Sequence, residues 1–133
     1  MQDANVDIVR RAYEAWGRMD MDGASAAWAP DIEWDLTHHE EGEGVVARGA
    51  AEVMALLAEW MGRWRAYEVT VRSVEPSGDH VVVTCDRRAL DRERAHADRR
   101  IAYVWTLREG RAVRVAAYSD VEQARRDAGL SRP

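Results

Sequence analysis

The 133-residue sequence predicts an α+β fold, with helices mainly in the first half of the chain and antiparallel strands in the second. Before residue 65, most apolar residues recur at three- and four-residue steps, as on one side of an amphipathic helix. After residue 65 they alternate with polar residues, as in half-buried strands, and turn residues separate the alternating segments. From this order we expect one domain, residues 1–133, in which a cone-shaped, curved antiparallel sheet wraps around a long helix and encloses a pocket.

Two helices are expected near the N-terminus. The first covers residues 5–20. Its apolar stripe consists of Val6, Val9, Tyr13 and Trp16. The second is short, over residues 22–28, and Pro30 ends it because proline does not continue a helix.

The first strand is expected over residues 31–36, where apolar and acidic residues alternate strictly. Its inward-facing residues are Ile32, Trp34 and Leu36. A polar, glycine-containing loop follows over residues 37–44, and a short strand covers residues 45–48.

A long helix is expected to start after Gly49, and its pattern is the clearest in the chain. One of its faces carries Val53, Leu57, Trp60, Met61 and Trp64. This helix is therefore expected to close the cone.

The second half of the chain predicts four antiparallel strands and a terminal helix. The strands cover residues 67–75, 80–88, 98–108 and 111–118, and the helix covers residues 121–129. Residues 87–100 have helical composition, but their place between two strands predicts a long hairpin. Because acids are interleaved with the arginines of this hairpin, we expect it to be a solvated rim.

Composition excludes several classes of protein. The 47% of apolar residues argue against disorder, the net charge of −5 against a nucleic-acid binder, and the lack of a long apolar run against a membrane span. The single cysteine, Cys85, excludes an intrachain disulfide. Because the first residues contain no apolar signal-peptide segment, we expect a cytoplasmic protein.

The chain resembles the nuclear transport factor 2-like superfamily, in its SnoaL-like and ketosteroid-isomerase-like branch. The matching stretches are VDIVRRAYEAW (6–16), WAPDIEW (28–34), ARGAAEV (47–53), AYVWTLREGRAVRVAAYSD (102–120) and AGL (128–130). The resemblance implies a homodimer and a deep apolar pocket. It does not imply one reaction, because the superfamily holds isomerases, cyclases, epoxide hydrolases, dehydratases and non-catalytic binders.

The resemblance does not reproduce the residues of a ketosteroid isomerase. The base of that family falls near Leu36, with Asp35 one position away and therefore on the other face of the strand. The acid of its oxyanion hole falls on Tyr103, and its helix-borne tyrosine falls on Ala12, next to Tyr13. These mismatches argue against steroid isomerisation.

The SnoaL-like cyclases give the best match, because their acid/base aspartate corresponds to Asp120. We expect Asp120 to act as base, His38 as proton shuttle and Tyr103 as hydrogen-bond donor to a substrate oxygen. His38 continues the inward alternation of the first strand. The alternatives are that Asp120 is the N-cap of the last helix and that His38 is a solvent-facing loop residue.

Aromatic residues provide the expected pocket walls. The candidate substrate-binding residues are Tyr13, Trp34, Leu36, Trp60 and Trp105. Six tryptophans suit a planar ligand, but they also fill the volume that phenylalanine, which is absent, usually occupies. Neighbouring residues 38–41, two histidines and two glutamates, rarely converge on one ion, so we expect no metal and no cofactor.

Two functional hypotheses follow. The first is a cofactor-independent isomerase or polyketide-cyclase-like enzyme that acts by acid/base catalysis on an apolar carbonyl compound. The second is a non-catalytic ligand-binding or dimeric interaction domain of the same fold. The expected partners are a small apolar or aromatic molecule and a second copy of the chain, which would pack on the outward sheet residues Arg114, Ala116 and Tyr118.

Overall fold

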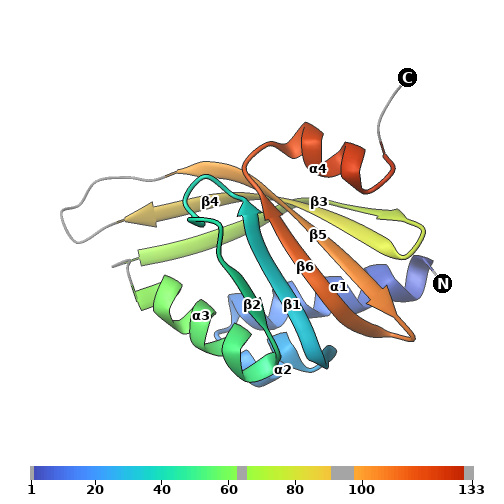
Figure 1. The fold of residues 1–133 in the computed structure, drawn as a ribbon, viewed down its shortest axis with the longest axis horizontal. Helices are drawn as coiled ribbons and strands as arrows, with labels where there is room; N and C mark the ends of the chain where they lie inside the picture. Colours follow the sequence, from blue (N-terminus) through green and yellow to red (C-terminus); the bar gives the residue numbers. More distant parts are fainter. Residues whose placement is uncertain (1, 63–65, 91–97, 131–133) are drawn as a thin grey trace.

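The computed structural model describes residues 2–62, 66–90 and 98–130, and six strands of this part form one curved, open sheet (Figure 1). The strands are β1 (Trp28–His38), β2 (Val46–Arg48), β3 (Ala66–Ser77), β4 (His80–Leu90), β5 (Arg99–Arg108) and β6 (Arg111–Tyr118). Their order across the sheet is β2-β1-β6-β5-β4-β3. The α+β prediction is confirmed, with one difference, because β1 and β6 pair in parallel within a sheet that is otherwise antiparallel.

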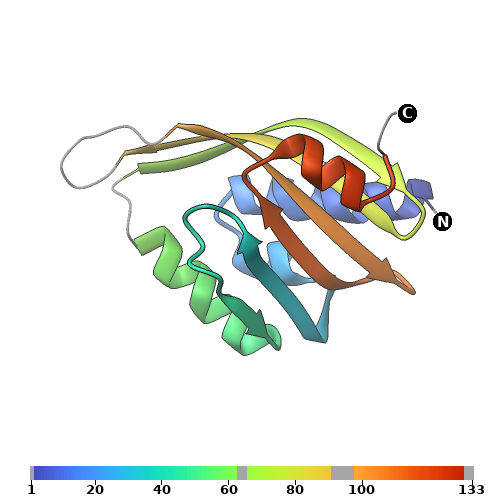
Figure 2. The same cartoon turned by 45° about the horizontal axis from the view of Figure 1, so that its top comes forward.

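Four helices accompany the sheet in the described residues. They are α1 (Gln2–Gly17), α2 (Met21–Ser25), α3 (Ala50–Gly62) and α4 (Val121–Asp127). Figure 2 shows α1, α2 and α3 on one side of the sheet and α4 on the other. The inner side is therefore covered by two long helices rather than by a single one.

Two apolar clusters lie on opposite faces of the sheet. The inner cluster joins α1 and α3 to the strands, and the outer cluster lies between α4 and β4, β5 and β6. On β4, Val81 and Val83 belong to the inner cluster, whereas Val82 between them belongs to the outer one. The continuous apolar run of this strand is thus explained by burial on both faces.

Pro30 and Pro76 lie inside strands, in contrast to the expected boundaries. Pro30 is part of β1, which begins at Trp28 instead of residue 31. The register with β6 shifts between Trp28 and Glu33, so the missing N–H of Pro30 falls where the ladder is already interrupted. Pro76 lies in β3, an edge strand, where a missing donor is tolerated.

Part of the outward face of the sheet is covered by α4 of the same chain, although the sequence analysis expected a second copy to pack there. Ala116 and Tyr118 are buried by α4 of the same chain, through Ala124 and Ala128. The Tyr118 hydroxyl also donates to a carboxylate oxygen of Asp127, at 2.8 Å. These two residues therefore give no argument for a dimer, because their burial needs no second copy.

The predicted hairpin is described at its base. β4 and β5 pair as far as Arg87 opposite Arg99, which fits two strands of one hairpin. Its tip, residues 91–97, lies outside the described residues, as does Trp64 at the end of the long helix. No helix of the described part is long and apolar enough to span a membrane.

Candidate functional site

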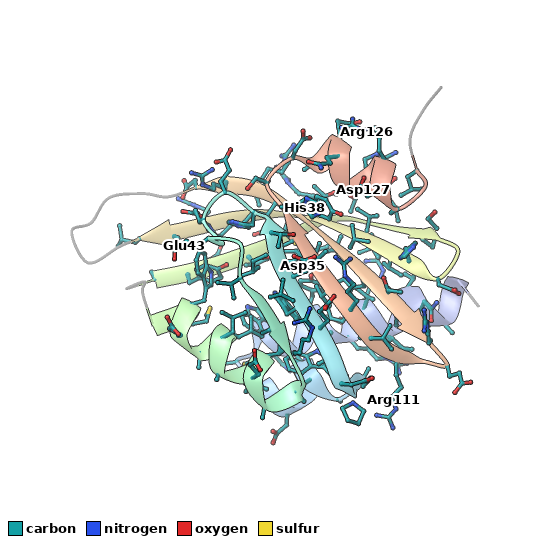
Figure 3. All side chains as sticks on the ribbon, viewed as in Figure 1. Asp35, His38, Glu43, Arg111, Arg126 and Asp127 are labelled. Carbon is teal, nitrogen blue, oxygen red and sulfur yellow. The ribbon has the colours of Figure 1, made fainter. Side chains whose placement is uncertain are left out.

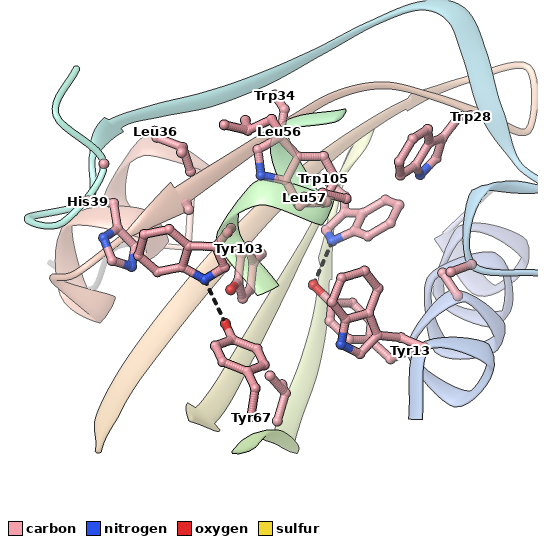
Figure 4. A pocket seen from close by; sticks show the side chains of 17 residues that line it. Tyr13, Trp28, Trp34, Leu36, His39, Leu56, Leu57, Tyr67, Tyr103 and Trp105 are labelled. Atoms are coloured by element: carbon pink, nitrogen blue, oxygen red, sulfur yellow. Dashed lines mark hydrogen bonds between the residues drawn. The ribbon is translucent and has the colours of Figure 1, made fainter. Parts of the chain in front are cut away.

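A cavity lies between the inner face of the sheet and helices α1, α2 and α3 (Figure 4). The cavity has a volume of about 80 Å³. Its aromatic lining consists of Tyr13, Trp16, Trp28, Trp34, His39, Trp60, Tyr67, Tyr103 and Trp105. None of the described residues that line it is an aspartate, glutamate or arginine, so its walls carry no fixed charge.

The structure brings the expected pocket residues together. Tyr13, Trp34, Leu36, Trp60 and Trp105 all line the cavity, and so does Tyr103. The alternation of β1 and β5 accounts for the strand residues, since side chains two positions apart share a face. The substrate-binding role of these residues stays a prediction.

Four rings enclose the centre of the cavity. Tyr13 and Trp34 lie on either side of Tyr103 and Trp105, with ring centroids 5.8–6.5 Å apart. Trp105 Nε1 donates to the Tyr13 hydroxyl oxygen at 3.1 Å, which links β5 to α1. These tilted and edge-on contacts fix the ring orientations, so the cavity has a defined shape.

A second hydrogen bond closes the α3 end of the cavity. Trp60 Nε1 donates to the Tyr67 hydroxyl oxygen at 3.2 Å, as Figure 4 shows. Burial raises the pKa of Tyr13 and Tyr103 well above the usual value for tyrosine, and it also raises that of Tyr67. All three phenols are therefore protonated and uncharged at neutral pH.

His39, and not His38, is the histidine of the cavity. The register between β1 and β6 shifts by one residue between Asp35 and His38, which reverses the inward and outward faces beyond that point. The exposed His38 ring stacks on Tyr118, with the ring centroids 4.5 Å apart. His38 lies on the outer side of the sheet, which faces the reader in Figure 3. The expectation that His38 faces the pocket is therefore wrong.

The environment of His39 keeps its ring neutral. The side chain is 7% exposed and meets the Trp60 ring edge-on, with centroids 5.9 Å apart. Burial lowers the His39 pKa, and the positive charges of Arg87 and Arg99 lower it further, although the nearby glutamates oppose this. Nδ1 accepts the Glu41 backbone N–H at 3.0 Å, so the neutral ring carries its proton on Nε2.

Asp120 lies outside the cavity. Its carboxylate accepts the Gln123 backbone N–H at 3.2 Å and caps α4, and the side chain is exposed. The direction of the chain after Tyr118 explains this position, because α4 turns onto the outer face of the sheet. The structure therefore does not bring Asp120, His38 and Tyr103 around one site.

One buried cation next to the site was missed by the sequence analysis. Arg87 was placed on the solvated rim, but its side chain is fully buried and donates to Glu41 Oε1 at 2.6 Å. It also lies over the Trp60 ring, 5.9 Å from the centroid. The signal was present in the sequence, since Val83 and Cys85 precede it on the inward face of β4.

The Arg87–Glu41 pair positions the loop that follows β1. Glu41 is also 3.6 Å from Arg99, whose guanidinium donates to Glu40 at 2.7 Å. These ion pairs hold the loop that carries His39 against β4 and β5. Among the residues that the structure describes, no group of three or more histidine, cysteine or acidic side chains could hold a metal ion.

Comparisons with known proteins identify the same architecture. Residues 9–115 match the family model of the SnoaL-like domain. An uncharacterized protein of Mycobacterium tuberculosis is 29% identical over 117 residues, which cover 87% of this chain and 88% of that protein.

Solved structures are similar over nearly the whole chain. A nuclear transport factor 2-like protein of unknown function from Burkholderia pseudomallei has a TM-score of 0.78 and 29% identity, covering 92% of this chain and 95% of that one. A candidate SnoaL-like polyketide cyclase from Jannaschia sp. CCS1 has a TM-score of 0.76 and 20% identity, covering 99% and 95%. At that identity the second likeness shows the fold alone.

Proposed function

The chain belongs to the SnoaL-like domain family, and we propose that it binds a small, uncharged apolar or aromatic molecule in the cavity beneath β1 and β5. One observation carries the proposal, namely that the lining is aromatic and aliphatic and contains no charged side chain. Burial of an uncharged planar ligand against these rings is favourable, whereas a charged group would lose its hydration without gaining a partner.

A calorimetric titration tests this function. Indane should bind, and indane-2-carboxylate should bind at least about tenfold more weakly because its charge is not compensated in the cavity. Leu56→Trp should abolish indane binding, because Leu56 lines the cavity and the larger ring fills it. Ala58→Trp on the exposed side of the same helix is the matched control. Equal binding of both compounds, or no binding of either, would contradict the proposal.

A second function is favoured by His39. A buried, neutral imidazole with its proton on Nε2 can donate a hydrogen bond to the oxygen of a carbonyl ligand, which stabilises the enolate formed when a solvent water takes a proton from the adjacent carbon. The protein would then be an enzyme of the isomerase or polyketide-cyclase type, with His39 as the donor to the substrate oxygen, the role first expected of Tyr103.

Deuterium exchange separates this enzyme from a binder. In D₂O, wild-type protein should accelerate exchange of the α-protons of 1-indanone, followed by NMR, and His39→Asn should reduce the rate to that of buffer. Asp120→Asn should exchange at the wild-type rate, because Asp120 lies outside the cavity. Exchange at the buffer rate with wild-type protein would leave binding as the function.

We also propose a homodimer and a cytoplasmic location. Part of the outer sheet face lies beyond α4 and carries Arg48, Glu33 and Arg114, which pair with one another there and offer a polar surface to a second copy. Light scattering coupled to gel filtration should give twice the mass of one chain, and a monomer at micromolar concentration would refute the dimer. Fractionation of the native cells would test the location.

A further inference from the structure

The polar atoms of the cavity are mostly hydrogen-bond donors. The side chains that line it contribute indole N–H groups, phenol hydroxyls and one imidazole. Indole nitrogen donates only, so side-chain acceptors are limited to the three phenol oxygens and His39 Nδ1.

Most of these acceptors are already occupied by donors of the protein. The Tyr13 oxygen accepts from Trp105 Nε1 at 3.1 Å, and the Tyr67 oxygen accepts from Trp60 Nε1 at 3.2 Å. His39 Nδ1 accepts from the Glu41 backbone at 3.0 Å. A ligand that needs an acceptor therefore finds few of them in the cavity.

Several donors remain for a ligand in the described part of the cavity, among them His39 Nε2, Trp34 Nε1 and the Tyr13 hydroxyl. Trp34 Nε1 has no acceptor within the described part of the chain, and it is not sealed from open space, in contrast to Trp28 Nε1. Figure 4 shows the Trp34 ring above Tyr103 and Trp105, among the side chains that line the cavity. The Tyr13 hydroxyl accepts from Trp105, and no described acceptor takes its own proton.

We propose that the cavity selects a ligand with an acceptor-only oxygen, a ketone or quinone carbonyl, over the corresponding alcohol, and that Trp34 Nε1 donates to that oxygen. The Tyr13 hydroxyl, on the other side of Tyr103 and Trp105, is a further donor. This inference rests on the proposed function, since it concerns what the same cavity binds.

The selectivity follows from hydrogen-bond balance. A carbonyl oxygen brings two lone pairs and no proton, so donors in the cavity satisfy it completely. An alcohol brings a proton as well, and burying that proton without an acceptor weakens binding by about tenfold or more. The ketone is expected to bind at least about tenfold more tightly than the alcohol for this reason.

A matched series of three probes tests the inference in wild-type protein by calorimetry. The probes are 1-indanone, 1-indanol and indane, which share one ring skeleton. The expected order of affinity is 1-indanone, then indane, then 1-indanol. If indane binds but 1-indanone and 1-indanol have equal affinity, the inference is wrong and the proposed function stands. If none of the three binds, the proposed function itself fails.

Variants then assign the donor. Trp34→Phe removes the N–H group and should lower 1-indanone affinity about tenfold while indane affinity changes less. Trp28→Phe is the matched control, because Trp28 also lines the cavity but its N–H is sealed from it. An unchanged ratio of 1-indanone to indane affinity in folded Trp34→Phe would overturn the assignment to Trp34. The wild-type series tests the selectivity even if this variant does not fold.

Discussion

The two faces of the sheet are buried in different ways. On the inner face, large rings such as Trp34, Tyr103 and Trp105 meet α1 and α3 and leave a cavity between them. On the outer face, small residues such as Ala102 and Ala116 allow α4 to pack directly on the strands. Planar rings in tilted and edge-on contact leave space between them on a curved surface, whereas alanines let a helix approach closely. Ligand binding is therefore expected on the inner face only.

The two faces of the sheet also differ in their charged groups. The outer face holds ion pairs between neighbouring strands, including Arg114 with Glu33 and Asp35 and Arg100 with Asp86. Among the residues that the structure describes, the inner face has one fully buried cation, Arg87, at the edge of the cavity. Variants on each face should accordingly differ in their effect on stability and on binding.

The largest expected effect is on the inner face. Ile32→Ala should lower the free energy of unfolding by about 3 kcal/mol, because the Ile32 side chain is completely buried in the inner cluster and leaves a void. Val121→Ala, at the half-buried edge of the outer cluster, should cost about 1 kcal/mol or less. Denaturant unfolding measures both, and equal losses would contradict the difference between the faces.

The next effect concerns the outer face and depends on pH. Burial alone would raise the Asp35 pKa, but hydrogen bonds from Thr37 and the charge of Arg114 outweigh it and lower the pKa. The stabilisation is therefore present above the unfolded-state pKa of about 3.9 and is lost as the pH falls through the lower folded-state value. Asp35→Asn should cost about 1.5 kcal/mol at pH 7.

Thermal unfolding between pH 7 and pH 3 checks this dependence. Wild-type protein should lose the contribution of Asp35 on the acid side, so the difference from Asp35→Asn should shrink there. Asp31→Asn, on the exposed side of the same strand, should follow the wild-type curve. A difference that stays constant to pH 3 would show that the lowered pKa of Asp35 does not contribute.

A smaller effect is expected at the start of α4. Asp120→Ala should cost about 1 kcal/mol of stability, because the Gln123 N–H loses its acceptor, while Asp120→Asn should stay within about 0.5 kcal/mol. Neither variant should change the affinity for indane, since Asp120 lies outside the cavity. A loss of ligand affinity in folded Asp120→Asn would restore Asp120 as a site residue.

The smallest effect separates the two neighbouring histidines. Burial lowers the His39 pKa, so the unfolded chain binds a proton more readily and stability should fall as the pH drops below about 6.5. His39→Gln should remove this shallow slope between pH 7 and pH 5, whereas His38→Gln should keep it because His38 is exposed. Parallel slopes for both variants in urea unfolding would contradict the difference between them.

Most of the fold and the walls of the cavity could be predicted from periodicity. Alternation in residues 31–36 placed Trp34 and Leu36 inward, and alternation in residues 98–108 did the same for Tyr103 and Trp105. Helical spacing similarly put Tyr13 on the buried side of the first helix. These inferences needed only local information, because side-chain direction repeats every two residues in a strand and about every 3.6 in a helix.

The polar part of the site could not be predicted in the same way. A one-residue register shift in β1 places His39 in the cavity instead of His38. The path of the chain after β6 places Asp120 at the start of α4, where it caps the helix. Whether Ala116 and Tyr118 face solvent depended on α4 packing on them. Local pattern thus determined the α+β class, the strands and the aromatic walls. Bulges, pairing partners and the packing of distant elements depend on contacts between residues far apart in the chain, so the tertiary structure alone decided which titratable side chain enters the cavity.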